Sequence, residues 1–167
     1  SSTLSHSQNT DYVKIYKKCN NEEMGASGIT DSIYASCKEN GNCINSLFKY
    51  LNSYPPSETK LASLTQMAVI FDGAGNHKKS IQAYKTALIK AKELGSKKIG
   101  RIYCTLSNQY ISIVQLDSAI YFNELALESI YSLNQKNDFW MPFFNLFTIY
   151  DALNDRKKAI SYLKQSY

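Results

Sequence analysis

The sequence contains few of the residues that interrupt helices, with only 7 Gly and 3 Pro among 167 residues. Sandwiches and barrels need many turns rich in these residues, so their scarcity argues against both architectures, whereas helical hairpins need few such residues. The apolar fraction of 44% argues against disorder. A chain of this length suits one domain or a short repeat array. We therefore expect an all-α fold from composition alone.

Residues that commonly carry out catalysis are also scarce. Histidine, the commonest acid or base, occurs only at His6 and His77, and neither stands beside a cysteine or a carboxylate pair. Glycine-rich phosphate loops, metal-binding histidine pairs and nucleophile elbows are absent from the sequence. Glu124 and Glu128 form a carboxylate pair, which we interpret as part of a solvated helix face. The sequence thus predicts that the protein is not an enzyme and uses no cofactor or metal.

No apolar run is long enough to cross a bilayer, and the charge is unremarkable for a soluble helix array. The net charge is +5, and many lysines occur in short pairs such as Lys78-Lys79 and Lys157-Lys158. Solvated helix ends explain such pairs better than a track for nucleic acid. We therefore expect neither a membrane span nor nucleic-acid binding in this segment.

The four cysteines, Cys19, Cys37, Cys43 and Cys104, do not have the spacing of zinc ligands. Cys37 and Cys43 are close enough in sequence to pair across a hairpin turn, although buried thiols are the alternative interpretation. A disulfide here would indicate a compartment outside the cytosol. Residues 1–9 are polar and rich in serine, as in a linker or the remnant of a cleaved leader or lipid anchor. These features favour a periplasmic or membrane-anchored extracytoplasmic location over a cytoplasmic one.

The strongest signal in the sequence is internal repetition. Three segments carry a large residue, then Leu or Met, a small or variable residue and an aromatic at helical spacing, followed nine residues later by a small residue and Ile. The three sets are Leu64, Met67, Ala68, Phe71, Ser80 and Ile81; Tyr103, Leu106, Ser107, Tyr110, Ala119 and Ile120; and Phe143, Leu146, Phe147, Tyr150, Ala159 and Ile160. The small residues at 80, 119 and 159 recur after 39 and 40 residues. This constant phase predicts a repeated helical hairpin whose helices cross at small residues.

These sets resemble the tetratricopeptide repeat, position by position, in the long-repeat form found in bacterial regulators, peptide receptors and eukaryotic cargo adaptors. The usual unit has about 34 residues, and the surplus here falls between hairpins, at 93–96 and 133–138. The resemblance implies an all-α, right-handed superhelix, or α-solenoid, of antiparallel hairpins. The expected segments are a flexible leader at 1–9, an N-terminal helix and loop at 10–27, a degenerate hairpin at 28–58, and repeats at 59–96, 97–137 and 138–167, the last one truncated.

The resemblance also implies a groove that is lined mainly by the first helix of each hairpin and that binds a protein or peptide. Its implied lining residues are Gln66, Val69, Arg101, Thr105, Asn108, Phe144, Asn145 and Thr148. Arg101, Asn108 and Asn145 offer hydrogen bonds to a peptide backbone or carboxylate. Co-chaperones of this family hold a C-terminal carboxylate with a clamp, but Thr65 and Val69 stand where a clamp lysine and asparagine would fall. We therefore do not expect this groove to bind chaperone tails.

Aromatic residues are dense at the start of the third repeat. They are Phe139, Trp140, Phe143, Phe144 and Phe147. They either pack between the second and third repeats or form, in part, an apolar pocket for a partner.

Two functions are compatible with such an array. The first is the interaction or sensing region of a longer bacterial signalling or regulatory protein, and the second is a free-standing adaptor or assembly protein. The sequence stops inside the second helix of the third repeat, which leaves an apolar face without the usual capping helix. We therefore expect either a continuation of the chain or a homo-oligomer formed through this C-terminal end.

Overall fold

The computed structural model describes residues 45, 48–49, 51–52 and 56–166 and is all-α over that part of the chain, as predicted. Its helices are α4 (Glu58–Gly73), α5 (His77–Leu94), α6 (Ile99–Ser112), α7 (Leu116–Ser132), the 3-10 helix η1 (Lys136–Asp138), α8 (Trp140–Ala152) and α9 (Arg156–Gln165). The expected leader at 1–9, the helix at 10–27, most of the hairpin at 28–58 and the Cys37–Cys43 pair lie outside the described residues.

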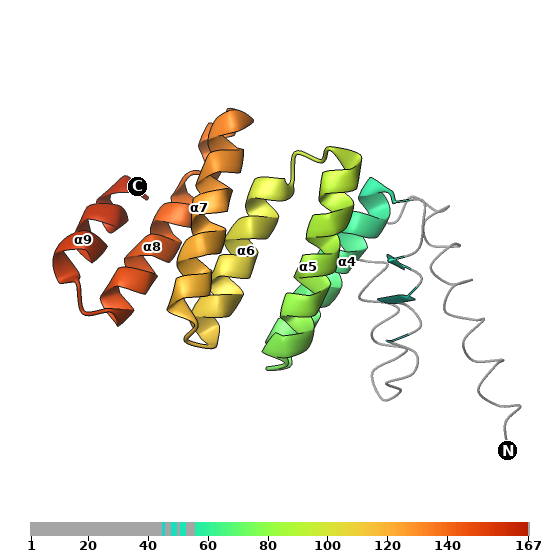
Figure 1. Cartoon of the computed structure of the whole chain (residues 1–167), viewed down its shortest axis with the longest axis horizontal. Coiled ribbons are helices and arrows are strands. Elements are labelled where there is room, and N and C mark those ends of the chain that lie inside the picture. Colours follow the sequence, from blue (N-terminus) through green and yellow to red (C-terminus); the bar gives the residue numbers. More distant parts are fainter. Residues whose placement is uncertain (1–44, 46–47, 50, 53–55, 167) are drawn as a thin grey trace, which may run out of the picture.

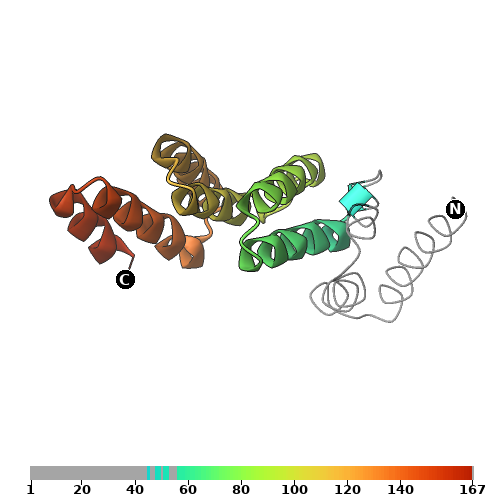
Figure 2. The ribbon, with the colours of Figure 1, turned by 90° about the horizontal axis from the view of Figure 1, so that it is seen from below.

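The helices form an elongated row in which consecutive helices run antiparallel (Figure 1). The closest partners are α4 with α5, α6 with α7, and α8 with α9. Contacts of α5 with α6, and of α8 with both α6 and α7, join each pair to the next. Seen along the helices, α5 and α7 lie on one side of the row and α4 and α6 on the other (Figure 2).

The turns inside the three pairs share one backbone geometry. The middle residue is left-handed in each, at Gly75 (φ 72°), Val114 (φ 58°) and Asn154 (φ 58°). The N–H of the following residue then donates to a carbonyl five residues earlier: Asn76 to Phe71 (2.8 Å), Gln115 to Tyr110 (2.9 Å) and Asp155 to Tyr150 (2.9 Å). Glycine and asparagine adopt this conformation readily, but a β-branched residue does so only under strain. The identical turns set the same reversal in every pair, and Val114 is the strained position.

Two serine hydroxyls join the helices of a pair where they cross. Ser80 Oγ in α5 donates to the Ala68 carbonyl in α4 at 2.8 Å, and Ser107 Oγ in α6 donates to the Ala119 carbonyl in α7 at 2.9 Å. All four residues are fully buried. The second pair thus makes the same link with donor and acceptor helices exchanged. Small side chains at both positions let the two backbones approach closely enough for this bond.

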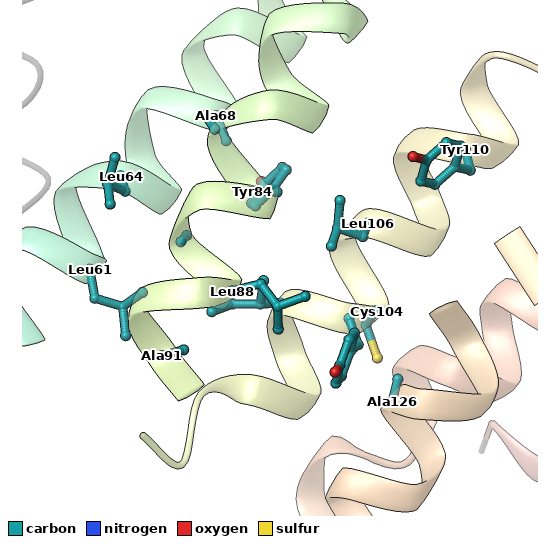
Figure 3. Packing of buried hydrophobic residues seen from close by; sticks show 14 of the residues in the cluster. Leu61, Leu64, Ala68, Tyr84, Leu88, Ala91, Cys104, Leu106, Tyr110 and Ala126 are labelled. Carbon is teal, nitrogen blue, oxygen red and sulfur yellow. The ribbon is translucent and has the colours of Figure 1, made fainter. Parts of the chain in front are cut away.

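Apolar side chains fill the space between the helices along the row. Figure 3 shows Leu61 and Leu64 of α4, Leu88 of α5 and Leu106 of α6 pointing into this interior. Leu61, Leu64 and Leu106 are completely shielded from solvent. The core is therefore continuous from one pair to the next, as needed when a single hairpin cannot bury its own apolar face.

The junctions between the helices of neighbouring pairs depend on close contacts of a few side chains. The Asn123 amide in α7 donates from Nδ2 to the Pro142 carbonyl in α8 at 3.0 Å, within a buried environment. Within the second pair, Phe122 of α7 stacks on Tyr110 of α6 with ring centroids 5.3 Å apart and so fixes α7 for its junction with α8. These contacts hold α7 and α8 in position, and they thereby orient the first helices α6 and α8 beside each other.

Candidate functional site

The first candidate site is a hollow between α4 and α6 with a volume of about 320 Å³, here called the α4–α6 hollow. It is lined by Ala62, Thr65, Gln66 and Val69 of α4, Tyr84 of α5, and Lys98, Arg101, Ile102 and Thr105 at or in α6. Val69 is half exposed at the surface of this hollow. The hollow therefore combines an apolar wall with amide, hydroxyl and cationic groups.

The two cations of the α4–α6 hollow are held by carboxylates from either side. Lys98 Nζ lies 2.9 Å from Glu58 Oε2, and Arg101 Nε donates to Asp138 Oδ1 at 3.2 Å. The hydrogen bond from Lys98 is the main cause that lowers the pKa of Glu58. Because Asp138 engages Arg101 through Nε, the terminal nitrogens of the guanidinium keep donors for a further acceptor.

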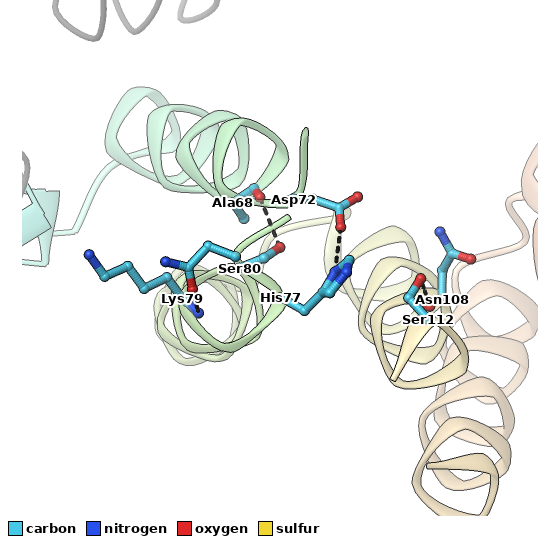
Figure 4. A network of polar contacts seen from close by, with 8 residues as sticks. Ala68, Asp72, His77, Lys79, Ser80, Asn108 and Ser112 are labelled. Carbon is cyan, nitrogen blue, oxygen red and sulfur yellow. Dashed lines mark hydrogen bonds and ion pairs between the residues drawn. The ribbon is translucent and has the colours of Figure 1, made fainter. Parts of the chain in front are cut away.

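Tyr84 lies at the inner wall of the same hollow and is buried. Burial, and secondarily the charge of Asp72, raises the pKa of Tyr84 to about 12, although a hydrogen bond with Thr105 acts in the opposite direction. The phenol is therefore neutral at physiological pH. Asp72 Oδ1 lies 3.0 Å from His77 Nδ1 and accepts a hydrogen bond from the imidazole ring (Figure 4).

The second candidate site is a hollow of about 230 Å³ between α6 and α8, here called the α6–α8 hollow. It is lined by Cys104, Thr105, Asn108, Trp140, Met141, Phe144 and Asn145. Thr105 borders both hollows, so they adjoin along α6. One wall is aromatic and the opposite wall carries the exposed Asn108 amide.

Seven of the eight residues predicted to line a groove border these two hollows. Gln66, Val69 and Arg101 border the first, Asn108, Phe144 and Asn145 border the second, and Thr105 borders both. Thr148 is not among the residues that border either hollow, and its hydroxyl donates to the Phe144 carbonyl one turn earlier at 3.1 Å.

Asn145 is held in place by another part of the chain. It is only 7% exposed, and its Nδ2 donates to the Cys104 carbonyl at 2.9 Å. The Asn145 amide donor, which the sequence predicted would bind a peptide, is therefore used to join α8 to α6. Tyr84 and Lys98, by contrast, border the hollow although the predicted lining did not include them. A rule that takes lining residues from first helices alone omits Tyr84, which belongs to α5.

The dense aromatic segment divides between the interior and the second hollow. Phe139 packs on Tyr131 with centroids 4.5 Å apart, and Phe143 stacks near Tyr162 at 6.5 Å. Trp140 and Phe144 stay about half exposed and border the α6–α8 hollow. Phe139 thus packs against the second repeat and Phe143 packs within the third, whereas binding of a partner at Trp140 and Phe144 stays a prediction.

Cys104 borders the second hollow, but its thiol is poorly suited to nucleophilic chemistry. Burial is the main cause that raises the pKa of Cys104 to about 12, so the thiol stays protonated. Over the described residues no group of three or more His, Cys, Asp or Glu side chains converges as a metal site would require. Nor does that part of the chain include a helix long and apolar enough to cross a membrane.

No protein-family model matches the sequence, and no curated protein matches it either. Among solved structures, the fold is similar to the crystal structure of BtubC (BKLC) from P. vanneervenii. The similarity has a TM-score of 0.50 at 14% sequence identity and covers 98% of this chain and 90% of that chain. At this identity the similarity concerns the fold alone, and it supports the all-α architecture.

Proposed function

We propose that the chain is a tetratricopeptide-type superhelix that binds a peptide or an extended protein segment along α4, α6 and α8. The observation that carries this proposal is the adjoining pair of hollows on successive first helices, which share Thr105. An extended segment of three to five residues spans about 10–17 Å, comparable to the separation of next-but-one helices in a row. A single ligand chain can therefore occupy both hollows.

The chemistry of the two hollows differs, which favours a ligand with a defined sequence. In the α6–α8 hollow, Trp140 and Phe144 offer exposed ring surface to an apolar side chain. Partly exposed aromatic anchors in a concave site commonly contribute most of the binding energy. In the α4–α6 hollow, Arg101 offers donors to a carbonyl or carboxylate of the ligand. We propose an anchor side chain at Phe144 and a polar backbone contact at Arg101.

Extended peptides bring backbone donors and acceptors that need partners when they are buried. The Gln66 and Asn108 side chains border the hollows, and neither side-chain amide makes a hydrogen bond to another described residue. An amide presents both a donor and an acceptor, so it can pair with a peptide unit of either orientation. We propose that these two side chains form hydrogen bonds with the backbone of the bound peptide.

We further propose that this binding serves a longer bacterial signalling or regulatory protein, with a free-standing adaptor as the alternative. The two roles share the groove and differ in what it is attached to. The coding DNA on both sides of this segment distinguishes them. A downstream membrane span, kinase or DNA-binding domain supports the signalling role, and a free-standing reading frame supports the adaptor.

Selection from a random peptide library on the immobilised protein, followed by anisotropy titration of the selected peptides, tests the groove. Phe144→Ala and Arg101→Ala should each weaken binding about tenfold, in keeping with the 1–2 kcal/mol typical of anchor residues. Ile160→Ala is the matched control, because Ile160 is an exposed apolar side chain of α9 away from both hollows. Selected peptides that bind all three variants as tightly as the original protein would exclude the groove as the site.

A further inference from the structure

A second surface lies on α5 and α7, on the side of the row that those two helices form (Figure 2). Each helix presents one outward stripe at helical spacing, and every residue of both stripes is exposed. The α5 stripe is Lys78, Gln82, Lys85, Ile89 and Lys92, and the α7 stripe is Asp117, Tyr121, Glu124, Glu128 and Tyr131. The stripes occupy equivalent positions, because each α7 residue follows its α5 counterpart by 39 residues.

The two stripes carry opposite charge. Three lysines stand on the α5 stripe, and three carboxylates stand on the α7 stripe, which has no cation anywhere along its helix. Random surface charge normally intersperses both signs on each helix. The segregation therefore places a basic ridge and an acidic ridge on one face of the molecule, with α6 between the two helices that carry them.

These charges have no ion-pair partners within the described residues. The carboxylates that form ion pairs there are Glu58, Asp72, Glu93, Asp138 and Asp155, and none of them belongs to the α7 stripe. On the α5 stripe, Lys85 and Lys92 instead lie over tyrosine rings of α6, with ammonium nitrogens 5.7 and 5.6 Å from the ring centroids. Their ammonium groups thus make cation–π contacts, and no carboxylate among the described residues neutralises them.

Apolar side chains stand among these charges. Ile89, Tyr121 and Tyr131 are 57%, 58% and 62% exposed, although each is large enough to bury a substantial apolar area. Aromatic residues are enriched at the centres of protein interfaces, where they contribute contact area at a low entropic cost. The two stripes therefore combine complementary charge with apolar contacts, as a docking surface requires.

From these features we infer that the α5 and α7 stripes form the interface of a two-fold symmetric dimer of this chain. A two-fold axis parallel to the helices, between α5 and α7, places α5 of one copy on α7 of its partner and α7 on the partner's α5. Because α5 and α7 run in the same direction, equivalent positions then meet. Lys78 faces Asp117 of the other copy, and Lys85 faces Glu124 of the other copy. Each pairing occurs twice, so two of the three lysines and two of the three carboxylates of each copy meet an opposite charge. The same register sets Ile89 opposite Glu128 and Lys92 opposite Tyr131 of the other copy.

The size of the surface sets the expected strength. A helix of 17 or 18 residues is about 25 Å long and about 10 Å wide, so two helices offer about 500 Å² per copy. A total near 1,000 Å² is at the low end for specific interfaces and corresponds to a reversible dimer. Because the pairs are solvated, the dimer should weaken strongly as salt rises. Among the residues that line the two hollows, only the buried Tyr84 belongs to α5 and none belongs to α7, and Tyr84 is not part of the α5 stripe, so a dimer leaves the proposed groove open.

Charge reversal tests the interface, because a reversal on the α5 stripe can be compensated by a reversal on the α7 stripe of the same chain. Analytical ultracentrifugation from low to hundreds of micromolar protein should show a dimer at about 0.05 M salt that weakens at about 0.5 M salt. Lys78→Glu with Lys85→Glu should raise the dissociation constant of the dimer at least tenfold, and Asp117→Lys with Glu124→Lys should do the same. All four changes together should restore the dimer, because the ridges then exchange signs. An equimolar mixture of the two double variants should form a heterodimer.

The control is Lys157→Glu with Lys164→Glu, which makes the same change in net charge on exposed lysines of α9. This variant should dimerise as the original chain does, and circular dichroism should show that all variants fold. A monomer at every concentration at low salt would overturn the proposal. A dimer that survives charge reversal on either helix, or that the quadruple variant fails to restore, would overturn it equally.

Discussion

Gly100 is the position where a single added methyl group should most directly test the packing of the second pair. Gly100 lies in the first turn of α6 and is buried against the end of α7. A Cβ atom there would lie 2.7 Å from Ile130 Cγ1, and 3.5 Å from both Ile130 N and Ser129 Cβ. Ile130 is completely buried and β-branched, so its Cγ1 cannot swing aside without moving neighbouring core residues.

Two opposing effects decide the outcome of Gly100→Ala. Alanine in place of glycine favours a helix by about 0.5–1 kcal/mol. Overpacking of a filled core costs about 1–3 kcal/mol. The steric term should win, and we expect Gly100→Ala to lower the free energy of unfolding by about 0.5–2 kcal/mol, measured by urea denaturation followed by circular dichroism.

Gly73→Ala is the matched control. Gly73 is the last residue of α4 and has no positive φ, and a Cβ there would meet no heavy atom within 4 Å beyond its chain neighbours and its own helix backbone. This substitution should leave the free energy of unfolding unchanged or raise it by up to about 1 kcal/mol. In an Ile130→Ala background, which removes the opposing Cγ1, Gly100→Ala should become neutral or stabilising. Equal stabilisation by Gly100→Ala and Gly73→Ala in the original chain would refute the close approach of α6 and α7.

Three further substitutions test the turn, the helix crossing and the buried phenol. Val114→Gly should raise the free energy of unfolding by about 0.5–1 kcal/mol, because it relieves the strain of a left-handed backbone and removes a side chain that is 76% exposed. Val114→Ala keeps a Cβ and should give no comparable gain, and thermal denaturation compares the two variants. Ser107→Ala should lower the free energy of unfolding by about 1 kcal/mol, because it removes the buried hydrogen bond to the Ala119 carbonyl. An unchanged urea midpoint would argue against that bond. The pKa of Tyr84 rises from 10.0 to about 12 on folding, so its contribution to stability is fully present below pH 10 and is lost as pH rises through 12. Urea titrations at pH 9 and about pH 11.5 should therefore show a smaller alkaline loss for Tyr84→Phe than for the original chain, and equal losses would contradict the shift.

The local contribution of the sequence is clearest at the first helices. The resemblance to the repeat family predicted that Gln66 and Val69, and Arg101, Thr105 and Asn108, face the groove. Helical periodicity is the physical reason why the members of each set share one face. The same periodicity put Ser80 and Ser107 at a buried crossing. These properties depend on residues three, four and seven apart in one helix, and the chain alone determines them. The scarcity of glycine and proline similarly predicted the all-α class.

Only the tertiary structure decided how those faces meet. Asn145 donates to the Cys104 carbonyl across 41 residues, and Arg101 engages Asp138 across 37. Neither pairing follows from periodicity, because the relative height and rotation of two helices depend on the side chains packed between them. For the same reason the tertiary structure separated Trp140 and Phe144 from the aromatic residues that pack inward. Local order is encoded within each helix, whereas the composition of a surface between helices is set by packing among residues that are distant in sequence.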